Sequence, residues 1–194
     1  MNRKRIYAFL IASLVSLNLF SSLNFVNVFA EENIIRNAAV YAEEEIPRSQ
    51  MIVSASSYEP SDAPSKAIDG NVATIWHTPW DGSAILPQSL TIDLGGTNNV
   101  SSMKVTPRVS TSNGIITKYE IYAIKGDNEV KVASGKWDYT NTPKNIVFDE
   151  AVSADKIKIV ALEGVGNYAS IAEVNIFRKV GEIEKIVGED NKRI

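Results

Sequence analysis

The chain has 194 residues and a near balance of charge, with 20 basic and 23 acidic side chains. The chain therefore has no excess of positive charge that would attract nucleic acid or an anionic membrane, and we expect neutral ligands. Cysteine is absent, and a domain of this chain must therefore be stabilised by core packing, by a bound metal, or by both.

The first thirty residues have the organisation of an export signal. A basic start at Arg3 to Arg5 precedes an apolar run that is interrupted by Asn and Ser, and Val28-Phe29-Ala30 follows. These last residues suit the positions that a signal peptidase recognises. We predict a signal peptide over 1–30 and a secreted, extracellular product; an uncleaved membrane anchor is the alternative.

The composition also predicts where the compact domain lies. Residues 31–49 are acidic, contain Pro47 and show no strand alternation, so we expect an acidic linker with at most a frayed helical turn. The domain is expected over 50–178, an ordinary size for a single core. Residues 179–194 are charged and poor in apolar residues, which predicts a charged linker or tail.

Most of the predicted domain shows the alternation of β-strands. From residue 88 onward, apolar residues alternate with polar ones, and turn formers break the pattern about every ten residues. With an early strand near 52–55, the pattern predicts about eight antiparallel strands, as in an all-β jelly-roll sandwich. The predicted strands lie near 52–55, 90–94, 103–105, 119–123, 130–132, 146–148, 157–161 and 174–176.

Two local features complete this pattern. Lys125-Gly126-Asp127-Asn128 predicts a hairpin turn between two of the strands. Residues 56–88 have few strand signals and many turn formers, so they should form long loops at one end of the sandwich. Loops on a rigid β scaffold are where binding residues usually lie.

Oxygen-bearing side chains gather in these predicted loops. Asp69, Asn71 and Thr74 surround Gly70, so a tight turn could aim their oxygens at one point, as a hard cation requires. The alternative is a plain turn in which Asp69 hydrogen-bonds its own backbone. The residues alone leave both interpretations open.

His77, the sole histidine, lies in a proline-containing loop between two tryptophans. An imidazole beside the flat face of Trp80 suits a sugar, which has hydroxyls on one side and a C–H surface on the other. A single histidine can also be a structural hydrogen-bonding residue, but its loop context favours binding. Trp76 continues the apolar phase of Ile75 and is predicted to be core, and Trp137 is predicted to pack as well.

Six separated motifs follow one another in the chain: Ser56-Ser57, Ala67 to Asn71, Thr74 to Thr78, Ile92 to Gly95, Pro107-Arg108 and Ala172 to Val174. Motifs in this order resemble those of coagulation factor type C (discoidin, F5/8 type C) domains. The resemblance covers 50–178 and implies a galactose-binding-like jelly roll with its ligand site in loops at one end. Within that superfamily the chain is most similar to family 32 carbohydrate-binding modules, which are typically appended to bacterial glycosidases and sialidases.

This resemblance implies a sugar site. His77 and Arg108 would hydrogen-bond the axial O4 and neighbouring hydroxyls of a galacto-configured sugar, and Trp80 would flank its ring. Glu59 would add an acidic contact, Asn113 an amide contact and Tyr168 a second aromatic ring. The implied ligand-binding residues are Glu59, His77, Trp80, Arg108, Asn113 and Tyr168.

The resemblance also implies a structural Ca²⁺ site. Such an ion would connect the binding loop to the final strand, keep His77 in place, and stabilise the fold by binding only the folded state. The side-chain ligands would be Asp69, Asn71, Thr74 and Glu173, with backbone carbonyls from Lys66 and Ala172.

The sequence does not indicate an enzyme. One histidine, no cysteine and no Gly-x-Ser-x-Gly pattern exclude the usual nucleophile–base sets. Glu59 and Asp81 lie near the loops, but neither has an evident carboxylate partner for glycoside hydrolysis. The sequence leaves open that a longer parent chain carries a catalytic domain.

We therefore expect a monomeric, non-catalytic module that binds terminal galactose or N-acetylgalactosamine on glycans. The alternative is a cell-surface adhesion module for protein or phospholipid headgroups. Apart from Ile85-Leu86, the loops lack the paired apolar spikes of such modules, which favours the sugar.

Overall fold

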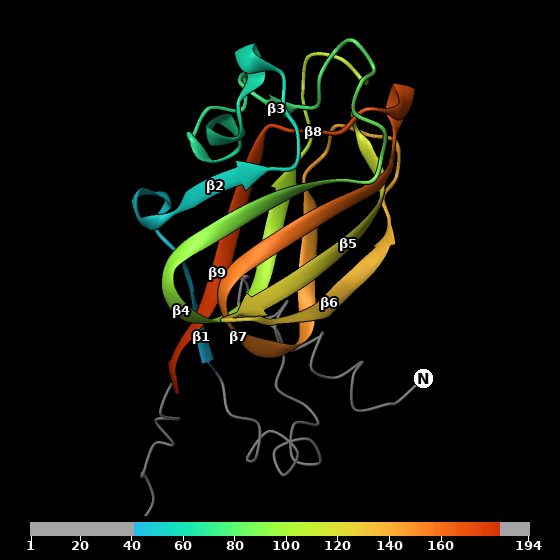
Figure 1. Ribbon diagram of the computed structural model, residues 1–194. Coiled ribbons are helices and arrows are strands. Elements are labelled where there is room, and N and C mark those ends of the chain that lie inside the picture. The colour runs from blue at the N-terminus through green and yellow to red at the C-terminus, as the bar shows by residue number, and fades with distance from the viewer. Residues whose placement is uncertain (1–40, 183–194) are drawn as a thin grey trace, which may run out of the picture. The chain divides into compact units, whose positions relative to one another are not determined.

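The computed structural model describes residues 41–182 (Figure 1). The predicted signal peptide and most of the predicted tail lie outside this range. The strands are β1 (Tyr41–Glu45), β2 (Ile52–Ala55), β3 (Trp76–His77), β4 (Gln88–Thr106), β5 (Ile116–Lys125), β6 (Asn128–Lys136), β7 (Lys144–Gly164), β8 (Ser170–Ile171) and β9 (Glu173–Glu182). Short 3₁₀ helices are η1 (Arg48–Gln50), η2 (Pro60–Asp62), η3 (Pro64–Ile68) and η4 (Val165–Asn167).

The strands form a two-layered sandwich in which β4 and β7 contribute to both layers. In one layer, β2 pairs with the first part of β4, which pairs with the second part of β7, followed by β5 and β6. In the other layer, β1 pairs with β9, β9 with the second part of β4, and β4 with the first part of β7. All these ladders are antiparallel, so the predicted all-β jelly-roll sandwich is confirmed.

The bend of β4 explains why two predicted strands are one. Its register to β7 shifts between Asp93 and Asn98, where the sequence predicts a break. Gly95 has a φ of 72° there and a Cβ on it would lie 2.5 Å from the backbone oxygen of Gln50. The glycine-rich run thus bends a continuous strand into the second layer. The predicted strands near 146–148 and 157–161 are likewise parts of β7.

The structure corrects the expected acidic linker over 31–49 in the part that it describes. Residues 41–45 form β1, which pairs with β9, and the amide of Ile46 donates to Ile176 O at 2.8 Å. No apolar–polar alternation marks this edge strand, because it contains three consecutive glutamates and the fully buried Ile46 comes only after its last residue. Strand β9 runs to Glu182, so the tail also begins later than predicted.

Several local predictions hold. The hairpin closes between Lys125 and Asn128. Trp76 is 1% exposed and donates its indole N–H to Ser57 O, while Trp137 stacks on Tyr119 and packs against the core. No helix among the described residues is long and apolar enough to cross a membrane.

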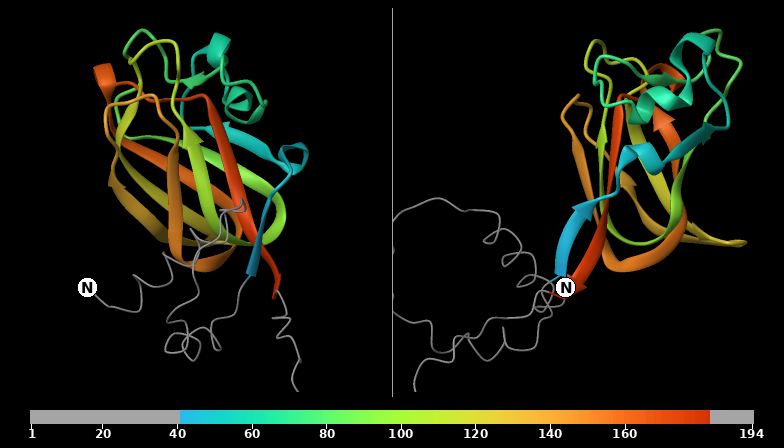
Figure 2. Two further views of the ribbon diagram at one scale, coloured as in Figure 1. Left: turned by 180° about the vertical axis from the view of Figure 1, so that it is seen from behind. Right: turned by 90° about the vertical axis from the view of Figure 1, so that its left-hand side faces the viewer.

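The loops and the described ends lie at opposite ends of the sandwich (Figures 1 and 2). The segment between β2 and β4, with β3, η2 and η3, gathers at one end beside β8 and η4. Tyr41 and Glu182 are register partners at the other end. The core therefore acts as a scaffold for one loop-bearing end.

Replacing Gly95 with alanine tests the bend. Gly82 has the same φ of 72° but open space around its Cβ position, so Gly82→Ala carries the same backbone strain without the clash. We expect Gly95→Ala to lower the free energy of unfolding by about 1–3 kcal/mol more than Gly82→Ala, measured by urea denaturation. Equal losses would show that β4 does not need the close approach.

Candidate ligand-binding site

A two-stranded ladder places the candidate site. Strands β3 and β8 pair Trp76 with Ile171 and His77 with Ser170. This ladder joins the loops after η3 to the segment that enters β9. Because Trp76 is anchored in the core, the adjacent His77 is fixed at the loop end of the sandwich.

The imidazole of His77 is a neutral hydrogen-bond acceptor. Its Nδ1 lies 2.5 Å from the carbonyl oxygen of Thr78, which can only accept, so Nδ1 carries the proton. Burial lowers the pKa of His77; the Thr78 hydrogen bond opposes this shift, and the charge of Arg108 adds to it. The buried Nε2 has no hydrogen-bond partner among the described residues. It is therefore left as an unused acceptor.

Aromatic rings surround this imidazole. The Trp80 indole stacks on His77 with 3.6 Å between ring centroids, and the Tyr168 ring lies 5.3 Å from His77. The Tyr168 hydroxyl donates to Trp80 O, and Glu59 Oε2 accepts from Trp80 N. His77 is fully buried while Trp80 is 40% exposed, so the indole covers the imidazole.

Arg108 brings a donor to the same place. Its Cζ lies 5.5 Å from the centroid of the Trp80 ring, and one terminal nitrogen donates to Asn113 O at 3.2 Å. The Asn113 side chain packs closely on η4, where a Cβ on Gly166 would lie 2.2 Å from its Oδ1. The Nε of Arg108 is buried without a hydrogen-bond partner in the described part of the chain. All six predicted ligand-binding residues thus lie in one cluster.

Sequence reasoning missed two residues of this cluster. Ser170 is 1% exposed, and its Oγ finds no partner within residues 41–182. A Cβ on Gly114 would lie 2.7 Å from this Oγ and 3.0 Å from Nε2 of His77. Glycine at 114 therefore keeps space beside both unpaired atoms. A two-residue strand such as β8 leaves no periodic signal that could have revealed Ser170.

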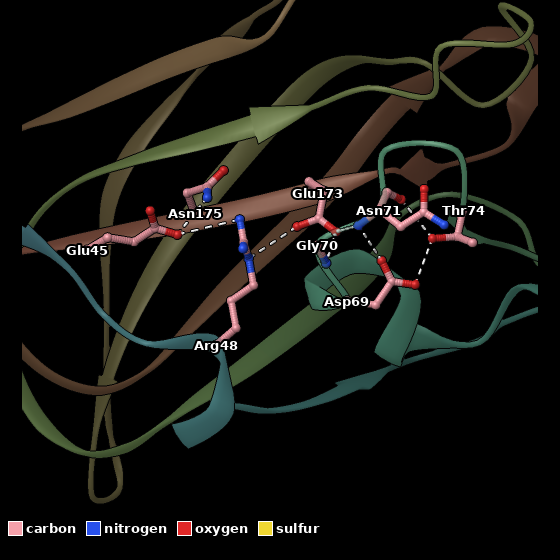
Figure 3. Close-up of polar contacts among 8 residues, drawn as sticks. All are labelled: Glu45, Arg48, Asp69, Gly70, Asn71, Thr74, Glu173 and Asn175. Atoms are coloured by element: carbon pink, nitrogen blue, oxygen red, sulfur yellow. Dashed lines mark hydrogen bonds and ion pairs between the residues drawn. The ribbon is translucent and has the colours of Figure 1, made fainter.

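The candidate cation residues also come together (Figure 3). Asp69 accepts hydrogen bonds from the Asn71 amide at 2.8 Å and the Thr74 hydroxyl at 2.7 Å. Glu173 Oε1 accepts from the amides of Gly70 at 2.6 Å and Asn71 at 3.0 Å. Asp69 therefore caps its own turn, as the plain-turn alternative requires, and it also lies beside Glu173, the other carboxylate of the expected cation site.

The pKa values of the two carboxyl groups, Asp69 and Glu173, shift in opposite directions. Burial raises the pKa of Asp69, but the hydrogen bonds from Thr74 and Asn71 outweigh it and lower that pKa overall. Burial raises the pKa of Glu173 above its usual value despite the amide of Gly70.

The donor set fits a cation that prefers oxygen. It combines two carboxylates with the amide of Asn71 and the hydroxyl of Thr74. The remaining predicted ligands flank it: Lys66 lies in η3, and Ala172 directly precedes β9. No group of three or more His, Cys, Asp or Glu that could hold a metal occurs in the described range. Neutral oxygens would therefore have to complete the shell.

Only one residue of the apolar pair Ile85-Leu86 is largely exposed to solvent. Ile85 is 70% exposed, whereas Leu86 packs against the core. The pair offers one exposed apolar side chain, not two, for insertion into a membrane or a protein groove. The pair therefore does not favour the adhesion alternative.

Comparison with known proteins identifies the family. The F5/8 type C domain family model matches residues 52–174. The chain belongs to the F5/8 type C domain family. The domain is similar to the family 32 module of Clostridium perfringens NanJ, solved in complex with galactose, at 51% identity and a TM-score of 0.69. That match covers 71% of this chain and all of the NanJ module.

A second solved module is also similar. CpGH89CBM32-5 of Clostridium perfringens, in complex with GalNAc-β-1,3-galactose, is 38% identical with a TM-score of 0.65. The match covers 69% of this chain and 99% of that one. The F5/8 type C domain thus resembles non-catalytic carbohydrate-binding modules over nearly their full length.

Curated relatives are much longer proteins. The domain is 37% identical over 137 residues to the A type blood N-acetyl-α-D-galactosamine deacetylase of Flavonifractor plautii, covering 68% of this chain and 18% of that protein. It is 37% identical over 118 residues to a sialidase of Micromonospora viridifaciens, covering 58% of this chain and 18% of that protein. The chain therefore spans under a fifth of their length.

Proposed function

We propose that the F5/8 type C domain binds terminal galactose or N-acetylgalactosamine on glycans. The observation that carries this proposal is the pairing of a neutral acceptor, His77 Nε2, with a donor, Arg108, beside the exposed indole of Trp80. The complexes of the two similar modules with galactose and with GalNAc-β-1,3-galactose support the same class of ligand.

The chemistry follows from what each group can do. A sugar hydroxyl can donate to Nε2 of His77 and accept from Arg108 at the same time, because a guanidinium only donates. An axial hydroxyl leaves the opposite C–H face of the sugar free to pack against the Trp80 ring. A sugar without that hydroxyl would leave two buried polar groups unpaired, which is a strong basis for discrimination.

Binding requires a change at Trp80. The indole covers His77 in this structure, so the sugar must displace it to reach Nε2. The indole–imidazole stack is then exchanged for an indole–sugar stack. Because few hydrogen bonds and one stacked face contribute, we expect a Kd on the order of 0.1–1 mM for a single sugar. Several copies acting together would bind glycans more tightly.

Substitution of Arg108 tests the sugar site. We expect Arg108→Gln to weaken galactose binding at least about tenfold, since a charged hydrogen-bond donor is lost. Isothermal titration with galactose and with glucose measures this, and glucose should bind more weakly. Arg178→Gln is the matched control, because Arg178 pairs with Glu44 and Asn98 away from the loops. Unchanged galactose binding in Arg108→Gln, or binding to liposomes but to no glycan, would reject the proposal.

Acid should weaken binding. The pKa of His77 is lowered by burial, so the ring is neutral at pH 7 and stays so somewhat below the usual histidine pKa of about 6.5. As pH falls through the lowered pKa, Nε2 gains a proton and ceases to accept. Galactose affinity should then fall up to tenfold per pH unit. NMR of this sole histidine reports its pKa directly, and affinity that is constant through that titration would contradict the acceptor role.

We also propose that Ca²⁺ binds the loop of residues 69–74. Asp69, Asn71, Thr74 and Glu173 would hold it with their side-chain oxygens, helped by carbonyls of Lys66 and Ala172. When bound, the ion supplies positive charge that neutralises the two carboxylates. These residues in turn connect the loop before β3 to β9, and so fix the position of His77 in the ladder.

Chelation tests this ion site. Ca²⁺ that binds only the folded domain raises its melting temperature, so excess EGTA should lower that temperature relative to millimolar CaCl₂. At a free concentration 100 times the Kd, the difference corresponds to about 2.7 kcal/mol. Differential scanning calorimetry measures it. Identical melting curves in both buffers would count against the site.

The wider setting is also part of the proposal. We infer that the domain is exported through the predicted signal peptide and accompanies a larger glycan-processing enzyme, because the segments that match it belong to a much longer deacetylase and a much longer sialidase. Its own residues would hold the glycan, and the chemistry would belong to another part of such a protein.

A further inference from the structure

Arg48 lies outside the family match at 52–174 but reaches the candidate cation site (Figure 3). Its Nε lies 3.3 Å from Oε2 of Glu173, and a terminal nitrogen lies 3.5 Å from Oε1 of Glu45. The Glu173 side chain is 4% exposed and that of Arg48 is 36% exposed. A residue from the segment expected to be a linker therefore pairs with a buried carboxylate.

The two oxygens of Glu173 have different partners. Oε1 accepts the backbone amides of Gly70 and Asn71, whereas the buried Oε2 has no hydrogen bond within the described residues and faces the Arg48 guanidinium. A buried carboxylate is costly unless a positive charge compensates it. Arg48 supplies that charge at Oε2, the oxygen that the loop amides do not use.

The guanidinium is itself held in place. Glu45, at the end of β1, accepts from Asn175 Nδ2 at 2.6 Å and faces Arg48 with the same oxygen. A Cβ on Gly70 would lie 3.7 Å from a terminal nitrogen of Arg48, so the guanidinium lies close beside the loop backbone. Arg48 thus links η1, the 69–74 loop and β9.

We propose that Arg48 is a built-in counter-cation that keeps Glu173 bound to the 69–74 loop when no Ca²⁺ is present. It is a positioning residue, because it acts on the loop through Glu173. The inference rests in part on the proposed Ca²⁺ site. A divalent ion near Glu173 takes over the neutralisation and repels the guanidinium, so Arg48 contributes less to stability when the ion is bound. Residues 41–50 are then part of the folded domain and support its candidate ion site.

The test compares four forms of the full chain: wild type, Arg48→Gln, Arg48→Lys and Arg178→Gln. Arg178 is the matched control because its side chain is 29% exposed and pairs with a glutamate of the same strand, β1, without contacting the loop. Melting temperatures are measured in EGTA and in millimolar CaCl₂. In EGTA, Arg48→Gln should melt on the order of 5 °C below Arg178→Gln. CaCl₂ should remove most of this gap.

Arg48→Lys should fall between wild type and Arg48→Gln, because an ammonium keeps the charge but cannot face Glu173 and Glu45 with separate nitrogens. A loss in EGTA no larger than that of Arg178→Gln overturns the role of Arg48. A loss that is large but equal in both buffers shows a purely structural contact and also overturns it. The wild type tests the Ca²⁺ proposal by itself. If CaCl₂ does not change its melting temperature, that proposal fails, and so does the inference that Ca²⁺ replaces Arg48 in neutralising Glu173.

Discussion

The loop end of this domain depends on one carboxylate. Glu173 accepts the amides of Gly70 and Asn71, which lie 103 and 102 residues away in the sequence. This contact attaches the loop before β3 to β9, and β3 itself places His77 in the ladder with β8. A buried acid that holds two backbone amides positions a loop more rigidly than apolar contacts alone, because hydrogen bonds to a charged acceptor are strong and directional. A buried carboxylate of this kind also needs a nearby positive charge, because an uncompensated buried charge is destabilising.

The ligand cluster shows the opposite arrangement, in which polar groups are left unpaired. Nε2 of His77, Nε of Arg108 and Oγ of Ser170 are buried without partners in the described range. Such groups reduce stability and are retained where a ligand can satisfy them. Gly114 preserves this state, because a larger residue would fill the space beside two of the atoms. The domain therefore separates an ion-paired region around Glu173 from a cluster of unpaired groups at the candidate ligand site.

The sequence predicted the fold class and the convergence of all six candidate binding residues, because alternation fixes strands and separated motifs fix their family. It could not predict that β4 is continuous, since Gly95 signals a turn as readily as a bulge. It missed β1, whose glutamates alternate with nothing apolar before Ile46. The burial of His77 under Trp80 is a tertiary contact, and the pairing of Arg48 with Glu173 joins distant segments. Neither has a local signature.

The pairing of β1 with β9 has a mechanical consequence. Tyr41 and Glu182 are neighbours at the end of the sandwich remote from the loops, so tension applied through the chain on both sides loads this ladder from one end. Antiparallel strands pulled in that way separate one hydrogen bond at a time, which needs little force compared with shearing a whole ladder. Peeling would begin at the edge strand and would reach Arg48 before the core of the sandwich. A domain attached by both ends would thus lose the pairing of Arg48 with Glu173 early under load, while most of its sheet stays folded.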